Sequence, residues 1–596
     1  MRVTLRPRRS AVLVALLVGA VAPAAACGGS GADAVIAPAD DAAAATDGAS
    51  SSDATVTTSD GAVVTDAAST DAALADSTAM DAGVVDATVL GDGGADGASV
   101  VDGGTDARPP RDTGRDGAVV TDADACPPAP TGTNRHVYVD STANPAVANG
   151  SEVCPFRQIT DAVNQTTPPG VGQTLTIHVW GEAPGTQYQE PNGVTLPQRT
   201  TLTTQWGGAP ADPSVVVLRS IGATAHGGVV LVPNASVLEG VTVDPTASSA
   251  QHGVVLAALT VTALAPPIVR KVLAWKAPQS GVWVQNKGTL GPGLVARENG
   301  TGVRIDGAAT IAGPDTHIDK NSGNGLEIAG LAGGTTEVTE ATASENGNHG
   351  VSLSGAGACT FTKLTASKNG GLGLGANGGA TLSLTASNSA FDDNGWSGVL
   401  AYPVGASGIG PALAFDDVSA SRNAVDGLRL KTHQAVKLGK IVAEGNATSP
   451  GAEVGGAGLF LDGTGTYFVR EGRFLGNTVG VLVVGQPGSL SLGEPNFGEA
   501  GDLGGNVFAR AVPGNNAKAG ICYLASPKSA SITARGNAWS SCPPAQTAIA
   551  KTSGFPKECY SPASYADITF QPAGNGASYD APLDTGSTTP ACTVGN

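Results

Sequence analysis

Asparagine recurs through the second half of this chain at a spacing that indicates a stack of similar units. The recurring residues stand 22 to 31 positions apart: Asn299, Asn321, Asn346, Asn369, Asn394, Asn423, Asn446 and Asn477. Gly follows most of them four residues later, and an apolar–x–apolar triplet such as Val303-Arg304-Ile305 comes next. The two-residue alternation of the triplet is typical of a strand. The repeat length fits one coil of three short strands and their turns.

The repeat predicts an all-β chain folded as a right-handed parallel β-helix. Stacked coils place equivalent residues about 4.8 Å apart, so that Asn side chains can form a buried hydrogen-bonded ladder. Asn and Gly also tolerate the left-handed turns between strands. A leucine-rich repeat has a ladder Asn too, but these repeats lack its L-x-x-L-x-L frame. We expect roughly 12 to 14 coils between Val194 and Trp539, with strands near residues 228–232 and 237–243 as earlier coils.

A strand and a short amphipathic helix are predicted ahead of the coils. Residues 136–140 alternate as a strand does, and Phe156, Ile159 and Val163 fall on one face of a helix. This opening resembles that of a family of bacterial β-helix proteins of mostly unknown function. The resemblance covers residues 134–545 and includes closing signatures at residues 504–508 and 532–539. It implies a helix that caps the open edge of the first coil.

The N-terminus is typical of an exported lipoprotein. Basic residues precede an apolar run, residues 11–22, that is too short to span a bilayer and fits a signal peptide over residues 1–26. Ala24-Ala25-Ala26-Cys27 resembles the bacterial lipobox, which implies that Cys27 carries lipid. Ala24 replaces the usual Leu, and ordinary cleavage after Ala26 is the alternative. Since residue 28 is not Asp, the resemblance implies a lipid-anchored protein of the outer membrane or cell surface.

Residues 27–125 are predicted to be a disordered tether rather than a domain. Residues 28–125 hold 19 Asp against three Arg, with no Lys, Glu, Trp, Tyr or Phe. Such a segment cannot repay the entropy of ordering. Its net charge of −16, with +4 from the signal region, leaves only −6 of the whole-chain −18 for residues 126–596. The acidity of the chain therefore says little about any ligand of its folded part.

Three further segments follow the tether, and their cysteines are typical of a protein exported to an oxidising compartment. Residues 126–193 are predicted to form the cap and first strands, residues 194–545 the β-helix, and residues 546–596 a C-terminal extension. Six cysteines lie at the two ends of this region: Cys126, Cys154, Cys522, Cys542, Cys559 and Cys592. Six cysteines allow 15 sets of disulfide pairs. Proximity in the sequence favours Cys126–Cys154, Cys522–Cys542 and Cys559–Cys592. Cys359 is predicted to be a buried apolar residue. No Cys or His spacing supports a metal site.

No catalytic motif is complete. The chain has no G-x-S-x-G, H-E-x-x-H or phosphate-loop sequence. The predicted fold resembles the pectin-lyase-like superfamily, which implies polysaccharide cleavage, with Ca²⁺ in its pectate lyases. The acidic pairs Asp392-Asp393 and Asp416-Asp417 fall in different columns of the repeat, so they do not form the paired carboxylates of a glycosidase. We therefore assign no catalytic residue and no cofactor.

The residue before each ladder Asn alternates in charge. In chain order the column reads Glu298, Lys320, Glu345, Lys368, Asp393 and Arg422. This pattern predicts a solvent-exposed column of opposite charges at coil spacing, in which each pair contributes roughly 0.2–1 kcal/mol.

Two functions of different classes follow from the sequence. The first is a non-catalytic adhesive or glycan-binding surface protein, whose outward residues Arg304, Glu327, Arg429 and Phe460 form part of a ligand face. The alternative is a polysaccharide lyase or hydrolase acting on an acidic polymer. The expected partners are a membrane, through the lipid, and an extracellular polysaccharide, without nucleic acid. We expect a monomer.

Overall fold

A computed structural model describes the part of the chain that carries the repeats. The described residues are 126–492, except 223, 225, 258–263, 331–333, 405–407, 447–455 and 485–488, together with 504–508, 519–523, 532–533, 538–539, 549–551 and 593–594. They belong to the second of two compact units, Val100–Asn596. The predicted signal peptide, Cys27 and the tether lie outside the described residues.

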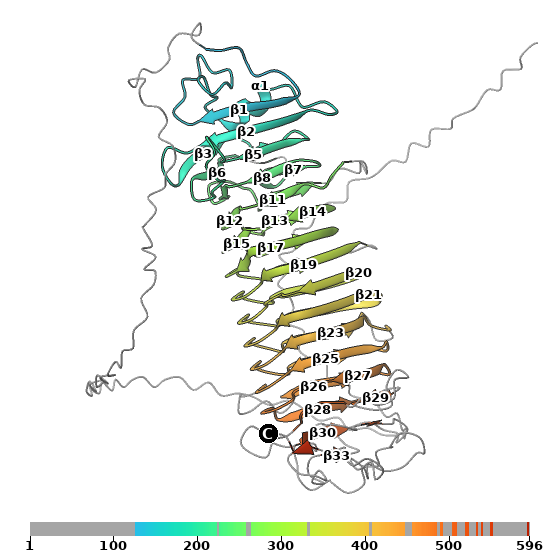
Figure 1. Cartoon of the computed structure of the whole chain (residues 1–596). Helices are drawn as coiled ribbons and strands as arrows, with labels where there is room; N and C mark the ends of the chain where they lie inside the picture. Colours follow the sequence, from blue (N-terminus) through green and yellow to red (C-terminus); the bar gives the residue numbers. More distant parts are fainter. Residues whose placement is uncertain are drawn as a thin grey trace, which may run out of the picture. The chain divides into compact units, whose positions relative to one another are not determined.

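Each strand pairs in parallel with the equivalent strand of the next coil, and the strands together form one continuous sheet that is folded into three faces (Figure 1). Face 1 consists of β4 (Val194–Thr195), β7 (Gly228–Pro233), β10 (His252–Ala257), β13 (Ser280–Val284), β16 (Thr301–Ile305), β18 (Leu326–Ile328), the first part of β20 (Val351–Thr362) and of β21 (Leu374–Ala390), β22 (Val399–Pro403), β24 (Leu428–Lys431), β26 (Ala457–Asp462), β28 (Val479–Val484), β30 (Ala519–Tyr523) and β33 (Ile549–Lys551). The strand predicted at residues 228–232 is β7, whereas residues 237–243 form two short strands, Val237–Glu239 and Thr242–Val243, separated by a turn at Gly240.

Face 2 follows each face 1 strand along the chain. It consists of β1 (Asn134–Asp140), β2 (Thr174–Trp180), β5 (Thr200–Thr203), β8 (Val237–Glu239), β11 (Ile268–Arg270), β14 (Lys287–Leu290), β17 (Ala308–Asp319), β19 (Thr335–Thr342), later parts of β20 and β21, β23 (Ala412–Ser419), β25 (Val436–Val442), β27 (Thr466–Arg470), β29 (Ser489–Ser491) and β31 (Ile532–Thr533). Because β1 and β2 already pair in register, the stack begins before Val194.

Face 3 completes each coil. It consists of β3 (Thr186–Glu190), β6 (Val216–Ser220), β9 (Thr242–Val243), β12 (Leu273–Trp275), β15 (Val295–Arg297) and the ends of the longer face 2 strands. A separate pair is formed by β32 (Ala538–Trp539) and β34 (Thr593–Val594). Among the described residues the one α-helix is α1 (Ile159–Gln165), so no described helix is long and apolar enough to cross a membrane.

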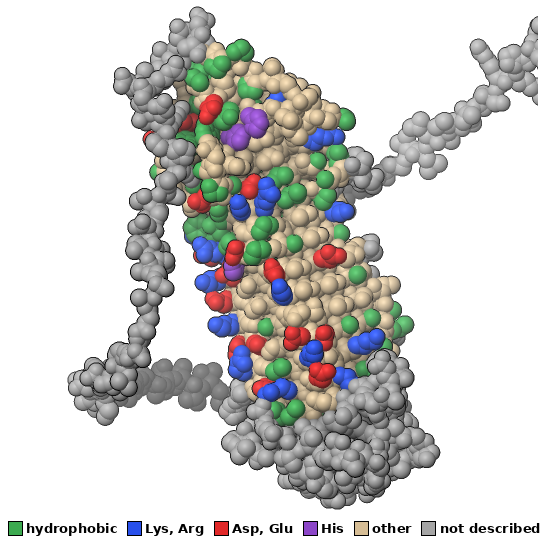
Figure 2. All heavy atoms as spheres, viewed as in Figure 1, with side chains coloured by type: hydrophobic (Ala, Val, Ile, Leu, Met, Phe, Trp, Pro, Cys, Tyr) green, Lys and Arg blue, Asp and Glu red, His purple; other side chains and the backbone are tan. Residues whose placement is uncertain are grey.

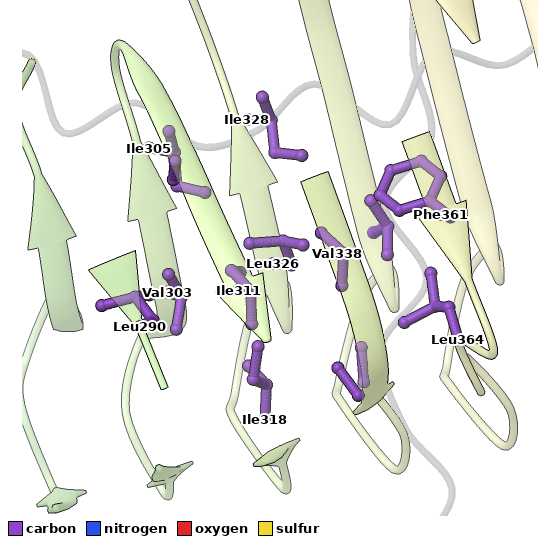
Figure 3. Packing of buried hydrophobic residues seen from close by; sticks show 14 of the residues in the cluster. Leu290, Val303, Ile305, Ile311, Ile318, Leu326, Ile328, Val338, Phe361 and Leu364 are labelled. Carbon is purple, nitrogen blue, oxygen red and sulfur yellow. The ribbon is translucent and has the colours of Figure 1, made fainter. Parts of the chain in front are cut away.

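The core fills the space between the three faces (Figure 3). The apolar triplets point their outer members inward, so that Val303 and Ile305 of β16 lie beside Leu326 and Ile328 of β18. These four side chains are fully buried. Burying an aliphatic side chain of this size contributes roughly 1.5–3 kcal/mol. In these two strands the middle residues of the triplets, Arg304 and Glu327, are partly exposed.

The asparagine column is a continuous chain of hydrogen bonds. From Asn299 to Asn477, each side-chain amide donates to the side-chain oxygen of the next Asn at 2.9–3.1 Å. The same oxygen accepts the backbone N–H of the preceding Asn at 2.9–3.1 Å. All eight side chains are at most 2% exposed. Each oxygen from Asn321 to Asn477 therefore has two donors, and that of Asn299 accepts the backbone N–H of Ala277, so the buried polar groups of the ladder are satisfied.

The alternating charges lie at the corner just before this ladder. All six residues adopt a left-handed conformation with φ between 56° and 58°, which explains why their side chains leave the stack and meet solvent. Arg422 contacts Asp393 at 2.8 Å, and Lys320 lies 3.9 Å from Glu345. Lys276 has the same conformation and extends the alternation by one coil. Lys276 was not predicted to belong to the column because Ala277 stands where a ladder Asn would be.

The first coil is covered by α1 and a disulfide-linked loop. The helix begins at Ile159, so the prediction that Phe156 lies within it is wrong. The backbone of Phe156 instead pairs with Tyr138 and Asp140 of β1. Two backbone N–H groups at the start of α1 donate to the buried Glu190 carboxylate. Cys126 and Cys154 form a disulfide, which is the pairing that proximity favoured.

Candidate functional site

The outward residues of face 1 form one straight row. Strand register aligns, coil after coil, Trp283, Arg304, Glu327, Ser352, Gly375, Leu400, Arg429 and Phe460. The four residues predicted for the ligand face, Arg304, Glu327, Arg429 and Phe460, are all in this row. Arg304 and Arg429 are five coils apart, which corresponds to about 24 Å.

One polar cluster lies at the N-terminal end of the row. Nε of Arg304 donates to Oδ1 of Asp306 at 2.9 Å, and the indole N–H of Trp283 donates to Oδ2 at 2.7 Å. Arg304 keeps 41% of its side chain exposed. One carboxylate thus fixes both a cation and an aromatic ring on the surface, and the unused guanidinium N–H groups remain available as donors.

His252 stands directly behind this cluster. Its ring centroid lies 4.6 Å from that of Trp283, and the residue is 7% exposed. Burial, helped by the charge of Arg304, lowers the pKa of His252 to about 4. Nδ1 of His252 has no hydrogen-bond partner among the described residues. The ring is therefore neutral at neutral pH and carries an unused polar atom beside the row.

A second cluster surrounds Arg429. Its guanidinium lies 4.5 Å above the ring of Phe460 and 3.9 Å from Oδ2 of Asp426. Phe460 is only 6% exposed, so the prediction that its ring belongs to a ligand face needs correction. The ring supports Arg429 by a cation–π contact instead. Arg429 itself is 34% exposed.

Asp426 is a buried carboxylate that the sequence did not reveal. It is 0% exposed, and its Oδ1 accepts the backbone N–H groups of Gly456 and Ala457 at 3.0 and 2.9 Å. Burial raises the pKa of Asp426, and Arg429 together with the two N–H groups opposes this shift. The strand register places Ser397 at the equivalent position of the preceding coil and Ala457 at that of the following coil, and neither is an acid. No repeat pattern therefore marks it.

Between the two clusters the row has smaller side chains and a single charged residue, Glu327. Ser352 and Gly375 are the middle members, and Glu327 accepts a hydrogen bond from Asn324 at 3.4 Å. The row thus carries one arginine near either end, each paired with an aspartate, with Glu327, Ser352, Gly375 and Leu400 between them, and this linear arrangement suits an extended ligand better than a compact one.

The acidic pairs do not assemble into a second site. Asp393 belongs to the corner column, whereas Asp392 accepts hydrogen bonds from Ser419 and the backbone of Ser421. Asp416 lies on β23 and pairs in register with Ser387. As predicted from their columns, the pairs do not share a face.

The remaining cysteines give little further chemistry. Cys359 is buried and free, and burial raises its pKa to about 12, which makes it unreactive. The side chains of Cys522, Cys542, Cys559 and Cys592 lie outside the described residues, so their pairing stays a prediction.

Residues 325–497 match a family model described as the right handed beta helix region. The folded part of this chain is a right-handed parallel β-helix. Its described strands make about 12 turns, as the repeat spacing predicted. No curated protein matches the sequence.

Three solved structures resemble the β-helix at low identity. The A-module of mannuronan C-5 epimerase AlgE6 from Azotobacter vinelandii is 15% identical, with a TM-score of 0.32, and the match covers 63% of this chain and 88% of that chain. The Dettilon tailspike protein gp208 is 12% identical, with a TM-score of 0.31 and coverage of 65% and 68%. Pectate lyase Pel9A is 15% identical, with a TM-score of 0.24 and coverage of 70% and 82%. We base no functional conclusion on them.

Proposed function

We propose that this protein binds an extended polysaccharide along face 1 of its β-helix without cleaving it. The observation that carries the proposal is the single row that holds Arg304, Glu327 and Arg429. The polar members of this row stand at multiples of the coil spacing of about 4.8 Å, so they can meet repeating groups of an extended polymer. The low stretch at Ser352 and Gly375 leaves room for a chain to lie across it.

The chemistry of the row fits sugar hydroxyl groups and carboxylates. Arg304 is fixed by Asp306 through one nitrogen, and its remaining N–H groups are directed outward. Trp283 offers an aromatic surface held in place by its own hydrogen bond. Aromatic surface with a few fixed polar groups is the usual composition of a binding site for small organic groups.

Binding to a polysaccharide array tests the proposal. We expect Arg304→Gln to weaken binding to the polysaccharide that the wild type selects, because the planar donor group is lost. Lys440→Gln is the matched control, since Lys440 is exposed at a corner away from face 1 and should bind as the wild type does. Equal binding by all three proteins, or no binding by the wild type to any polysaccharide, would contradict the proposal.

Cleavage is separated from binding by a second assay on the same proteins. Release of unsaturated or reducing ends from acidic polysaccharides, with and without Ca²⁺, detects a lyase or a hydrolase. We expect no release. Release that Arg304→Gln abolishes would replace the binding proposal with the enzymatic alternative.

We also propose that a lipid on Cys27 anchors the protein at the outer membrane or cell surface and that residues 28–125 hold the β-helix away from it. The lipobox-like sequence and the one-sided charge of the segment support this. Metabolic labelling with a fatty acid should mark the wild type, and Cys27→Ser should remove the label. An unlabelled wild type would refute the anchor while leaving the face 1 proposal intact.

A further inference from the structure

Two histidine side chains meet on face 2 of the first coils. His136 on β1 and His178 on β2 are 42 residues apart in sequence, yet Nδ1 of the first lies 3.0 Å from Nε2 of the second. Strand register aligns Tyr138 with His178, so His136 lies diagonally across the strand pair. His136 is exposed and His178 half-buried. Figure 2 shows histidine side chains together near this end of the stack.

The ring of His178 is held in one orientation. Its Nδ1 lies 2.6 Å from the main-chain oxygen of Gln205, which can only accept, so Nδ1 carries the proton and Nε2 presents a lone pair towards His136. The ring stacks on Tyr138 at 5.0 Å and contacts the edge of Trp206 at 6.4 Å. A histidine that binds a metal usually donates its other ring N–H to a carbonyl in this way.

We propose that Nδ1 of His136 and Nε2 of His178 together bind a divalent transition-metal ion such as Zn²⁺, with water completing its coordination. Metal–nitrogen bonds are about 2.0–2.1 Å long, so two nitrogen ligands of one ion lie about 2.9 Å apart at right angles and about 3.3 Å apart in a tetrahedral site. The 3.0 Å separation of the two atoms falls between these values. The ion would replace the proton that the two rings share and would link β1 to β2.

The surroundings favour an ion of this class over Mg²⁺ or Ca²⁺. Imidazole nitrogen suits Zn²⁺, Cu²⁺ and Ni²⁺, whereas the hard cations prefer oxygen ligands. The negative charge of Glu152 acts on the ring of His178 and favours a cation there. Glu152 lies on the loop whose ends, Gly150 and Phe156, hydrogen-bond to Tyr138.

The site has two protein ligands and no more. No group of three or more His, Cys, Asp or Glu side chains comes together for metal binding anywhere in the part of the chain that the structure describes. The expected affinity is therefore below that of a closed structural zinc site. Motif spacing cannot predict this pair, because the two residues come together only through coil stacking.

Calorimetric titration of the full-length protein with ZnCl₂ at neutral pH tests the site. The wild type should show a binding event that His136→Gln and His178→Gln each weaken by on the order of tenfold or more. His433→Gln is the control, because His433 is exposed and its Nδ1 bonds to Thr464 rather than to another histidine. Titration with CaCl₂ is a second control, for weak cation binding by the many carboxylates, and it should give the same result for all four proteins.

Electron paramagnetic resonance of added Cu²⁺ gives a second measure that does not depend on affinity. We expect two nitrogen ligands in the wild type and in His433→Gln, and one in either site variant, with far-ultraviolet circular dichroism unchanged. Equal Zn²⁺ binding by all four proteins, or a Cu²⁺ spectrum that the site variants leave unchanged, would overturn the proposal. These outcomes do not bear on polysaccharide binding at face 1.

Discussion

The side-chain amide of Asn369 donates to the side-chain oxygen of Asn394 at 3.0 Å, and both residues are 2% exposed. The oxygen of Asn369 in turn accepts two hydrogen bonds from Asn346, one from its backbone and one from its side chain. Each Asn thus serves the coil before it and the coil after it. The ladder joins neighbouring coils through buried hydrogen bonds, and because its side chains are shielded from solvent, water does not take the place of a lost partner.

Removing one member of the ladder should therefore be costly. Asn369→Ala leaves two buried donors of Asn346 and the side-chain oxygen of Asn394 short of a partner. An unsatisfied buried group costs about 1–3 kcal/mol, so we expect about 3 kcal/mol in the free energy of unfolding. Urea denaturation measures it. Thr385→Ala, an exposed position on β21, should change the same quantity by less than about 0.5 kcal/mol.

The corner column should depend on the order of its charges. Glu345 follows Lys320 and precedes Lys368 in the column, so Glu345→Lys places three like charges at coil spacing. We expect a loss of around 1 kcal/mol at low salt that shrinks as salt is added, because the column faces water. Glu337→Lys is the matched control, since Thr310 and Thr360 are its register neighbours. Equal effects of the two substitutions would mean that the column does not act through charge.

The periodic features could be predicted from sequence because each coil repeats them. The Asn ladder, the charge column and the row of Arg304 and Arg429 all depend on a position within the repeat, and that position fixes the direction of a side chain. Features that depend on one coil alone escaped prediction. Asp426 has no acidic equivalent in its neighbours, and Phe460 is buried although its position points outward.

The N-terminal strand, helix and disulfide were predicted, but the start of the helix was not, for a related reason. An apolar face at helical spacing suggested a helix that includes Phe156. The backbone of Phe156 instead forms hydrogen bonds with β1, a long-range contact that periodicity does not report. The pairing of His136 with His178 likewise depends on a stacking register that no local pattern contains.

His252 should make the β-helix sensitive to mild acid. Its folded-state pKa of about 4 lies below the ordinary value of 6.5, so the folded state binds the proton less well than the unfolded state. Stability is fully present above pH 6.5 and falls as the pH drops towards 4, by up to about 3 kcal/mol. The pH dependence of urea unfolding measures this, and His252→Gln should flatten it. A wild-type slope that persists in His252→Gln would assign it to other groups.

Asp426 should contribute a pH dependence of the opposite sign. Its raised pKa means that the folded state holds the proton more tightly than the unfolded state, whose value is near 3.8. Its contribution is therefore fully present below pH 3.8 and is lost as the pH rises through the folded pKa. Asp426→Asn keeps an acceptor for Gly456 and Ala457 and should remove this part of the profile. If Asp426→Asn leaves the pH dependence of the unfolding free energy unchanged, a group other than Asp426 takes up the proton.

Hydroxyl-radical footprinting of tryptophan tests the central proposal, polysaccharide binding along face 1, most directly. Trp283 lies in the face 1 row, whereas Trp275 lies on face 3 beneath Lys276 and serves as an internal control. With the polysaccharide selected on the array, we predict slower oxidation of Trp283 and an unchanged rate for Trp275. If the polysaccharide binds while Trp283 is oxidised as fast as before, face 1 is not the binding surface.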